Sequence, residues 1–252
     1  MRPNKWFVRT LWSAVIFLAL IGVAAVTRRT IVLLWPGSLS SPHNPAASLD
    51  SNFAKHRALT MVHIIPGLLF MVLGPLQFAG WIRSRHLRFH RWSGRIFVGA
   101  GLVIGLSALL MSFKATIGGA NETAATTLFA IIFLFDLVKA FVHIRQGQIA
   151  QHREWMIRAF AIGLAVATIR PIVALFFAFS PLTHLTPQQF FGTAFWIGFT
   201  IHLIAGEIWI NYTRWRPQVV ITSRRSKFFQ SDQDTVAPEF DRDRVIGRGF
   251  TQ

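Results

Sequence analysis

The chain contains no cysteine, only one tyrosine and few charged residues. Without cysteine there are no disulfides, thiolate metal sites, iron–sulfur ligands or cysteine nucleophile. Charged residues make up 14% of the 252 residues and hydrophobic ones 52%, whereas soluble domains carry roughly 25% charged residues. This shortage of polar side chains excludes one or two ordinary soluble domains.

Acidic residues are also scarce, because ten Asp and Glu face 26 Lys and Arg, which makes the formal net charge +16. Such an excess of basic residues is typical of nucleic-acid binders, of proteins on anionic lipid surfaces and of the cytoplasmic loops of membrane proteins. A nucleic-acid binder carries its charge on a polar surface, which this chain lacks. We therefore expect a membrane protein with no nucleic-acid partner.

Six apolar stretches are long enough to cross a bilayer, which takes about 20 residues. None shows the alternating pattern of a barrel strand. The predicted fold is therefore all-α, a polytopic bundle of six transmembrane helices that occupies residues 1–216. The predicted spans are about 6–26, 58–82, 92–113, 123–144, 155–179 and 190–212.

The remaining segments are polar. The outer connection 27–57 has a Pro-, Ser- and Asn-rich middle at 36–45 that is predicted to be an irregular extracytoplasmic loop. Residues 217–252 are predicted to form a basic, disordered cytoplasmic tail. The first span also resembles a signal peptide, but its apolar run is long for one, so we expect a retained helix, with cleavage as the alternative.

The basic residues predict the orientation of the bundle. With the N-terminus in the cytoplasm, 19 Lys and Arg fall on the cytoplasmic side and five on the outer side. The positive-inside rule then places both termini in the cytoplasm. For a bacterial source, we expect a multi-pass protein of the cytoplasmic (inner) membrane. The expected partners are the lipid bilayer and anionic lipid headgroups at the cytoplasmic face.

Four Asp, Glu, Lys or Arg side chains lie five or more residues from the ends of the predicted spans, where burial of a charge is costly. Asp136 and Lys139 are three residues apart, which favours an ion pair within one helix. Glu207 is expected to reach the headgroups or a basic loop. Arg170 lies about 13–15 Å from the outer end of its span at 1.5 Å per residue, so we expect it to face the bundle interior and an anionic or carbonyl partner.

Histidine is the other polar residue that stands out. Neutral imidazole ligates haem iron, and histidines on neighbouring helices can hold a haem between them. An outer site would use His63 with His202, and an inner site His90 with His143 or His152. We take His63 and His90 as the leading candidates for haem-iron ligands. The alternative for the inner histidines is that they anchor helix ends at the headgroups.

Several short strings resemble the integral-membrane family catalogued as domain of unknown function 2306, over roughly residues 57–180. The first and sixth spans and the tail lie outside this resemblance, which implies a polytopic membrane protein and carries no established activity. The strings are L-G-P-L-Q-F at 73–78, L-R-F-H-R-W-S-G-R at 87–95, H-R-E-W-M-I-R at 152–158 and T-I-R at 168–170, together with His63 and Gly67.

Two functional hypotheses from different classes follow from these residues. The first is a membrane redox protein that binds b-type haem or quinone, with a redox partner, in which Arg170 contacts a haem propionate or a quinone oxygen. The second is a non-enzymatic transporter, or an assembly or scaffold protein, with structural His and Arg anchors. In that case Asp136, Lys139, Arg170 and Glu207 would line a pathway. Whether the chain is an enzyme, or a homo-oligomer, stays open.

Overall fold

A computed structural model describes residues 4–35 and 47–214, and every regular element in these ranges is an α-helix. Six of the helices are long and apolar enough to cross a membrane, which confirms the predicted fold class. Two short helices, α2 (Ala47–Lys55) and α4 (Gly80–Arg85), lie between them. The six long helices are α1 (Lys5–Leu34), α3 (Arg57–Phe78), α5 (Leu87–Lys114), α6 (Gly119–Arg145), α7 (Ile149–Thr183) and α8 (Pro187–Arg214).

The connection after the first span differs from the prediction. Helix α1 continues to Leu34 instead of ending near residue 26, and α2 covers 47–55. The part predicted to be irregular, 36–45, lies outside the described residues, so the differences are the longer α1 and the helical segment 47–55. The physical reason is tertiary, because Arg28 and Arg29 in the last turns of α1 both pair with Asp50 of α2. The predicted tail 217–252 lies outside the described residues.

The second span ends earlier than predicted. Helix α3 stops at Phe78, and Ala79 adopts an extended conformation with φ −66° and ψ 116°. The chain then turns into α4, which carries Arg83 and Arg85 in its last turn. The predicted span 58–82 thus comprises α3 and the start of α4, with a break at Ala79. Ending α3 at Phe78 puts those two arginines on a separate short helix that leads into α5.

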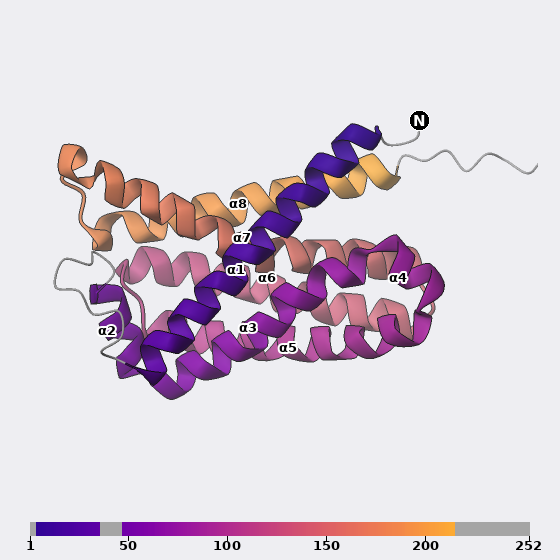
Figure 1. Cartoon of the computed structure of the whole chain (residues 1–252), viewed down its shortest axis with the longest axis horizontal. Helices are drawn as coiled ribbons and strands as arrows, with labels where there is room; N and C mark the ends of the chain where they lie inside the picture. Colours follow the sequence, from indigo (N-terminus) through magenta and orange to yellow (C-terminus); the bar gives the residue numbers. More distant parts are fainter. Residues whose placement is uncertain (1–3, 36–46, 215–252) are drawn as a thin grey trace, which may run out of the picture. The chain divides into compact units, whose positions relative to one another are not determined.

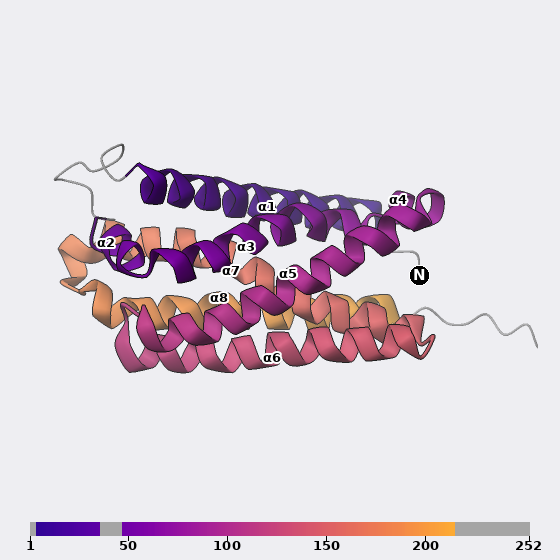
Figure 2. The ribbon, with the colours of Figure 1, turned by 90° about the horizontal axis from the view of Figure 1, so that it is seen from below.

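The helices pack as a bundle in which α7 contacts α8, α6 and α1, while α3 contacts α5 and α1 (Figures 1 and 2). Small residues permit the closest approaches, as the Gly101 and Gly105 pair of α5 shows. A Cβ added at these positions would lie 2.7 Å from Leu137 and 2.5 Å from Leu134 of α6. The two glycines thus let α5 and α6 approach closely.

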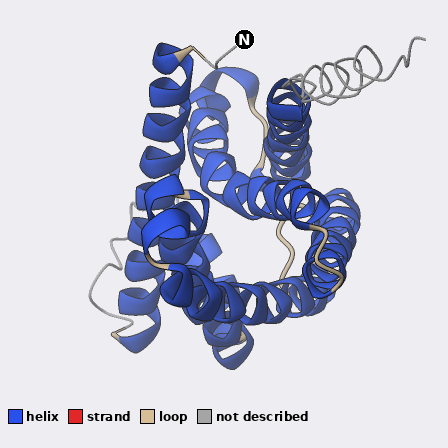
Figure 3. Ribbon diagram, turned by 90° about the vertical axis from the view of Figure 1, so that its right-hand side faces the viewer, coloured by secondary structure: helices blue, strands red, loops and turns tan. Residues whose placement is uncertain are grey.

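We name the two ends of the bundle by what they carry. The basic end holds α4, the α6–α7 turn and Arg214, and there the Asn4 backbone N–H donates to the Tyr212 hydroxyl at 3.4 Å. The opposite end, the α2 end, holds α2 and the α5–α6 and α7–α8 turns (Figure 1). Figure 3 looks onto the basic end.

Aromatic side chains fill the middle of the bundle. Phe70 of α3 stacks on Phe97 of α5, with ring centroids 4.2 Å apart, and both are almost completely buried. Phe133 of α6 and Phe160 of α7 pack against Phe70. This layer closes the bundle centre, and the space above it, toward the α2 end, is where the candidate site lies.

Candidate ligand-binding cavity

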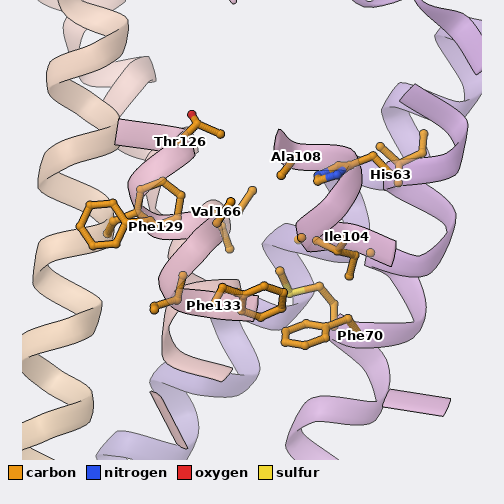
Figure 4. Close-up of a pocket in the computed structure, with 18 of the residues that line it drawn as sticks. His63, Phe70, Ile104, Ala108, Thr126, Phe129, Phe133 and Val166 are labelled. Carbon is orange, nitrogen blue, oxygen red and sulfur yellow. The ribbon is translucent and has the colours of Figure 1, made fainter. Parts of the chain in front are cut away.

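A cavity of about 590 Å³ lies in the half of the bundle nearest α2. This volume is within the range of small-molecule sites. A smaller pocket of about 100 Å³ continues it inward to the phenylalanine layer and shares His63, Thr126 and Arg170 with it (Figure 4). The walls are mostly apolar, and they include Val26, Ile64, Ala108, Met111, Val166, Ile169, Val173, Phe177, Phe195 and Phe199.

Arg170 of α7 projects into this apolar cavity. Arg170 lines both the cavity and the smaller pocket. Its side chain therefore keeps accessible surface although it lies within the bundle. Among the described residues it forms neither an ion pair nor a hydrogen bond through its side chain. The sequence predicted an interior orientation and an anionic or carbonyl partner for Arg170. The structure gives the first and, within the described chain, not the second.

Two further arginines lie on the cavity wall toward α2, and both have partners. Asp50 accepts from Arg28 at 2.8 and 3.1 Å and from Arg29 at 2.6 Å. The Arg29 guanidinium also lies 4.3 Å from the ring centroid of Phe53. Both arginines are within electrostatic range of Arg170. One carboxylate therefore serves two arginines, and the charge of the third is not compensated.

The one acidic side chain of the cavity wall is already engaged. Glu122 accepts the backbone N–H groups of Ile117 and Gly118 at 2.7 and 2.6 Å, at the start of α6. Because these contacts hold its carboxyl at the helix terminus, Glu122 pairs with no arginine of the cavity. The wall as a whole thus favours an anion.

His63 of α3 is held in a fixed orientation at the cavity. Its Nδ1 lies 2.9 Å from the hydroxyl of Ser107, and that hydroxyl donates to the backbone carbonyl of Val103 at 2.6 Å. The serine oxygen therefore accepts the Nδ1 proton, which leaves Nε2 with a free lone pair. Figure 4 shows the ring beside Ala108, across the pocket from Thr126. This is the arrangement in which histidine ligates a metal.

The other candidate histidines are placed elsewhere. His202 bonds to Thr168 through Nε2 at 2.7 Å and does not line the cavity, so it does not share the site of His63. At the basic end, His152 Nδ1 donates to the Ala140 carbonyl at 2.8 Å, and His143 Nδ1 contacts Gln148. His90 lies within electrostatic range of His152. The outer pair is not assembled at this cavity, and the inner rings lie near the opposite end.

The ionisable residues of the spans also differ from expectation. The Asp136–Lys139 pair does not form, because Asp136 is turned into the helix interface while the Lys139 ammonium lies 5.8 Å from the Trp155 ring centroid. Glu207 pairs instead with Arg158 of α7. Of the four residues predicted to line a pathway, only Arg170 lines the cavity.

Sequence reasoning missed several residues of the cavity. Arg28 and Arg29 were counted only as basic residues of the outer side, although two adjacent arginines at the end of a span were a usable signal. Ser107 and Thr126 carried none, because a single hydroxyl inside an apolar helix usually bonds to its own backbone. Only the packing of α3 against α5 shows that Ser107 faces His63.

Comparison with known proteins identifies the family. The model of the family described as predicted membrane protein (DUF2306) matches residues 60–210, which is more than half of the chain. The chain therefore belongs to this family. The match extends through most of α8, so the sixth span, which sequence inspection left out of the resemblance, lies inside it. No curated protein and no solved structure matches the chain.

Proposed function

We propose that this member of the DUF2306 family binds, in the cavity near α2, an apolar molecule that carries an anionic oxygen-bearing group. The observation that carries the proposal is Arg170, a guanidinium without a protein partner in the described chain that faces apolar walls. A charge in such surroundings is costly unless an opposite charge compensates it. A carboxylate or phosphate accepts two parallel hydrogen bonds from a guanidinium.

Haem b is the redox-active molecule of this class that fits the residues present. His63 offers a free Nε2, with Nδ1 held by Ser107, and Arg170 offers a partner for a propionate. When bound, haem would supply one-electron transfer. The chain's own contribution would be to orient the His63 ring and to compensate the propionate charge. Because His202 does not line the cavity, this site provides a single histidine ligand.

A quinone fits the same space less well. Its carbonyl oxygens would accept hydrogen bonds from Arg170 and Thr126, and the apolar walls suit its ring and tail. A quinone is neutral, however, so the positive charge of Arg170 would stay uncompensated. A molecule with an acidic group, either haem b or a lipid acid, is therefore the better match. A transporter or scaffold draws no comparable support, because Asp136, Lys139 and Glu207 lie away from the cavity.

The test is ligand binding by the purified full-length chain in detergent, with haemin, a long-chain fatty acid and a short-chain quinone as probes. We expect saturable binding of at least one acidic probe, and a loss of affinity of at least tenfold in Arg170→Leu. If haemin is the ligand, the oxidised and dithionite-reduced visible spectra show haem bands that His63→Ala loses. His202→Ala is the matched control and keeps both properties.

The outcomes distinguish a lipid acid from haem b as the molecule that carries the acidic group. Fatty-acid binding without haem bands assigns the cavity to a lipid acid, whereas haem bands lost in His63→Ala assign it to haem b. Preference for the quinone over both acidic probes, or equal binding by wild type and Arg170→Leu, would contradict the proposal.

For the basic end, we propose the orientation and partners expected from the charge pattern. The exposed side chains there include Trp81, Trp92, Arg85, Arg88 and Arg91. Aromatic and basic side chains together suit a membrane interface with anionic headgroups. This supports the basic end as the cytoplasmic one, in the inner membrane.

A further inference from the structure

Asp136 of α6 is a buried acidic side chain that the proposed ligand site does not use. It is 1% exposed, and its Oδ2 has no hydrogen-bond partner. It forms no ion pair among the described residues. Lysine and arginine outnumber acidic residues in this chain, so a carboxyl without a cation in the middle of a span requires an explanation.

The charged groups around Asp136 come from two neighbouring helices. Arg158 of α7 and Glu207 of α8 are both within electrostatic range of it. The Arg158 guanidinium binds the Glu207 carboxylate through Nε and through Nη2, the latter at 3.0 Å. From α5, Gly101 packs on this part of α6 and brings no charge. On α6 itself, Lys139 is directed at Trp155.

The charges of this cluster do not balance. The cluster contains one guanidinium and two carboxyl groups, and the guanidinium already pairs with Glu207. With both carboxyls ionised, the cluster has a net charge of −1 inside an apolar bundle, where an uncompensated charge is very costly. One bound proton makes the cluster neutral. The carboxyl that lacks both a hydrogen-bond partner and solvent is the one on which that proton costs least.

We propose that Asp136, Arg158 and Glu207 form a membrane-embedded proton-binding site, with the proton on Asp136. Glu207, whose side chain is 39% exposed, is the most accessible member of the cluster. Asp136 lies one turn of α6 beyond Phe133, which lines the inner pocket. The proposal rests on the burial of Asp136 and on the Arg158–Glu207 pair, and it is independent of what the cavity binds.

Infrared spectroscopy of the full-length protein in lipid measures such a proton directly. Near neutral pH, we expect a carbonyl band from one protonated carboxylic acid, which shifts in heavy water. Asp136→Asn removes this band, because the amide keeps the shape of the side chain and carries no acid. The matched control is Asp50→Asn, in which an acid already paired with Arg28 and Arg29 is removed and the band stays.

The charge balance supplies a second readout. In Glu207→Gln, the positive charge of Arg158 and the negative charge of an ionised Asp136 cancel. No bound proton is then needed for neutrality, so the same band is lost although Asp136 is still present. The absence of an acid band in the wild type, or a band that survives in Asp136→Asn, would overturn the proposal. A band that persists unchanged in Glu207→Gln would overturn the shared site and assign the proton to Asp136 without the pair.

Discussion

Arg158 and Arg170 lie on the same helix, and the structure predicts that removal of Arg158 lowers stability whereas removal of Arg170 does not. Arg158 pairs with Glu207 and lies 4.5 Å from the ring centroid of Trp155. Arg170 has no polar partner among the described residues and faces an apolar cavity. Replacement of each by leucine keeps the apolar part of the side chain and removes the charge. The two variants therefore test directly whether the Arg170 guanidinium lacks a partner in the protein.

The magnitudes follow from these contacts. Removing one partner of a buried ion pair costs about 3–5 kcal/mol. The side chains of Arg158 and Glu207 are 17% and 39% exposed, so solvent screening reduces the expected loss to about 1–3 kcal/mol for Arg158→Leu. Arg170→Leu loses no ion pair. We expect its free energy of unfolding to stay within about 0.5 kcal/mol of the wild type or to rise by about 1 kcal/mol.

The assay is reversible unfolding of the delipidated, ligand-free protein in mixed micelles, followed by helical circular dichroism as the denaturing detergent is increased. With ligand added, the wild type gains stability by linkage and Arg170→Leu gains less. The expected difference is refuted if ligand-free Arg170→Leu loses as much stability as Arg158→Leu. That result would mean that the Arg170 guanidinium has a structural partner in the protein.

Four further predictions follow from individual contacts. Gly105→Leu brings side-chain atoms into Leu134, so we expect the free energy of unfolding to fall by about 1–3 kcal/mol in the same assay. At Gly99 an added Cβ meets nothing within 4 Å, so Gly99→Ala should not lower stability. Equal effects of the two substitutions would contradict the close approach of α5 and α6. Asp50→Asn leaves Arg28 and Arg29 without their carboxylate, so amide hydrogen exchange in α2 should rise at least severalfold, while exchange in α4 stays unchanged. His202→Ala removes the hydrogen bond to Thr168 and should cost about 0.5–1.5 kcal/mol without weakening ligand binding, and a binding defect would place His202 at the site. Because the chain has no cysteine, Ser84→Cys and Thr183→Cys each introduce a single thiol, the first at the basic end and the second at the α2 end. A membrane-impermeant thiol reagent added to intact cells should label Thr183→Cys only. Labelling of Ser84→Cys only would refute the predicted orientation.

Part of the cavity was visible in the sequence. Arg170 stood out because an arginine deep in an apolar span is costly wherever it points, and His63 stood out for the same reason. The pairing of His63 with His202 was a prediction that their two helices bring the rings together. In the structure each ring instead bonds to a hydroxyl on an adjacent helix, His63 to Ser107 and His202 to Thr168. Spacing along a helix shows which face a residue occupies. It does not show which helix that face meets.

The ion pairs show the same limit. Asp136 and Lys139 are close along α6, which favoured a local pair, yet the observed pair joins Arg158 to Glu207 across two helices. Local spacing is informative when both side chains point into the same space. Here Asp136 points into the helix interface and Lys139 lies over Trp155, so their spacing of three residues decided nothing.

The sequence by itself determined that the described part of the chain holds six helices long and apolar enough to cross a membrane, because length and hydropathy are properties of each segment alone. The tertiary structure decided which polar groups meet. It assigned Asp50 to two arginines, Glu207 to Arg158 and Ser107 to His63, and it left Arg170 and Asp136 without a partner among the described residues. Such pairing depends on the rotation and contact of whole helices, and many arrangements of six apolar helices satisfy the same sequence pattern.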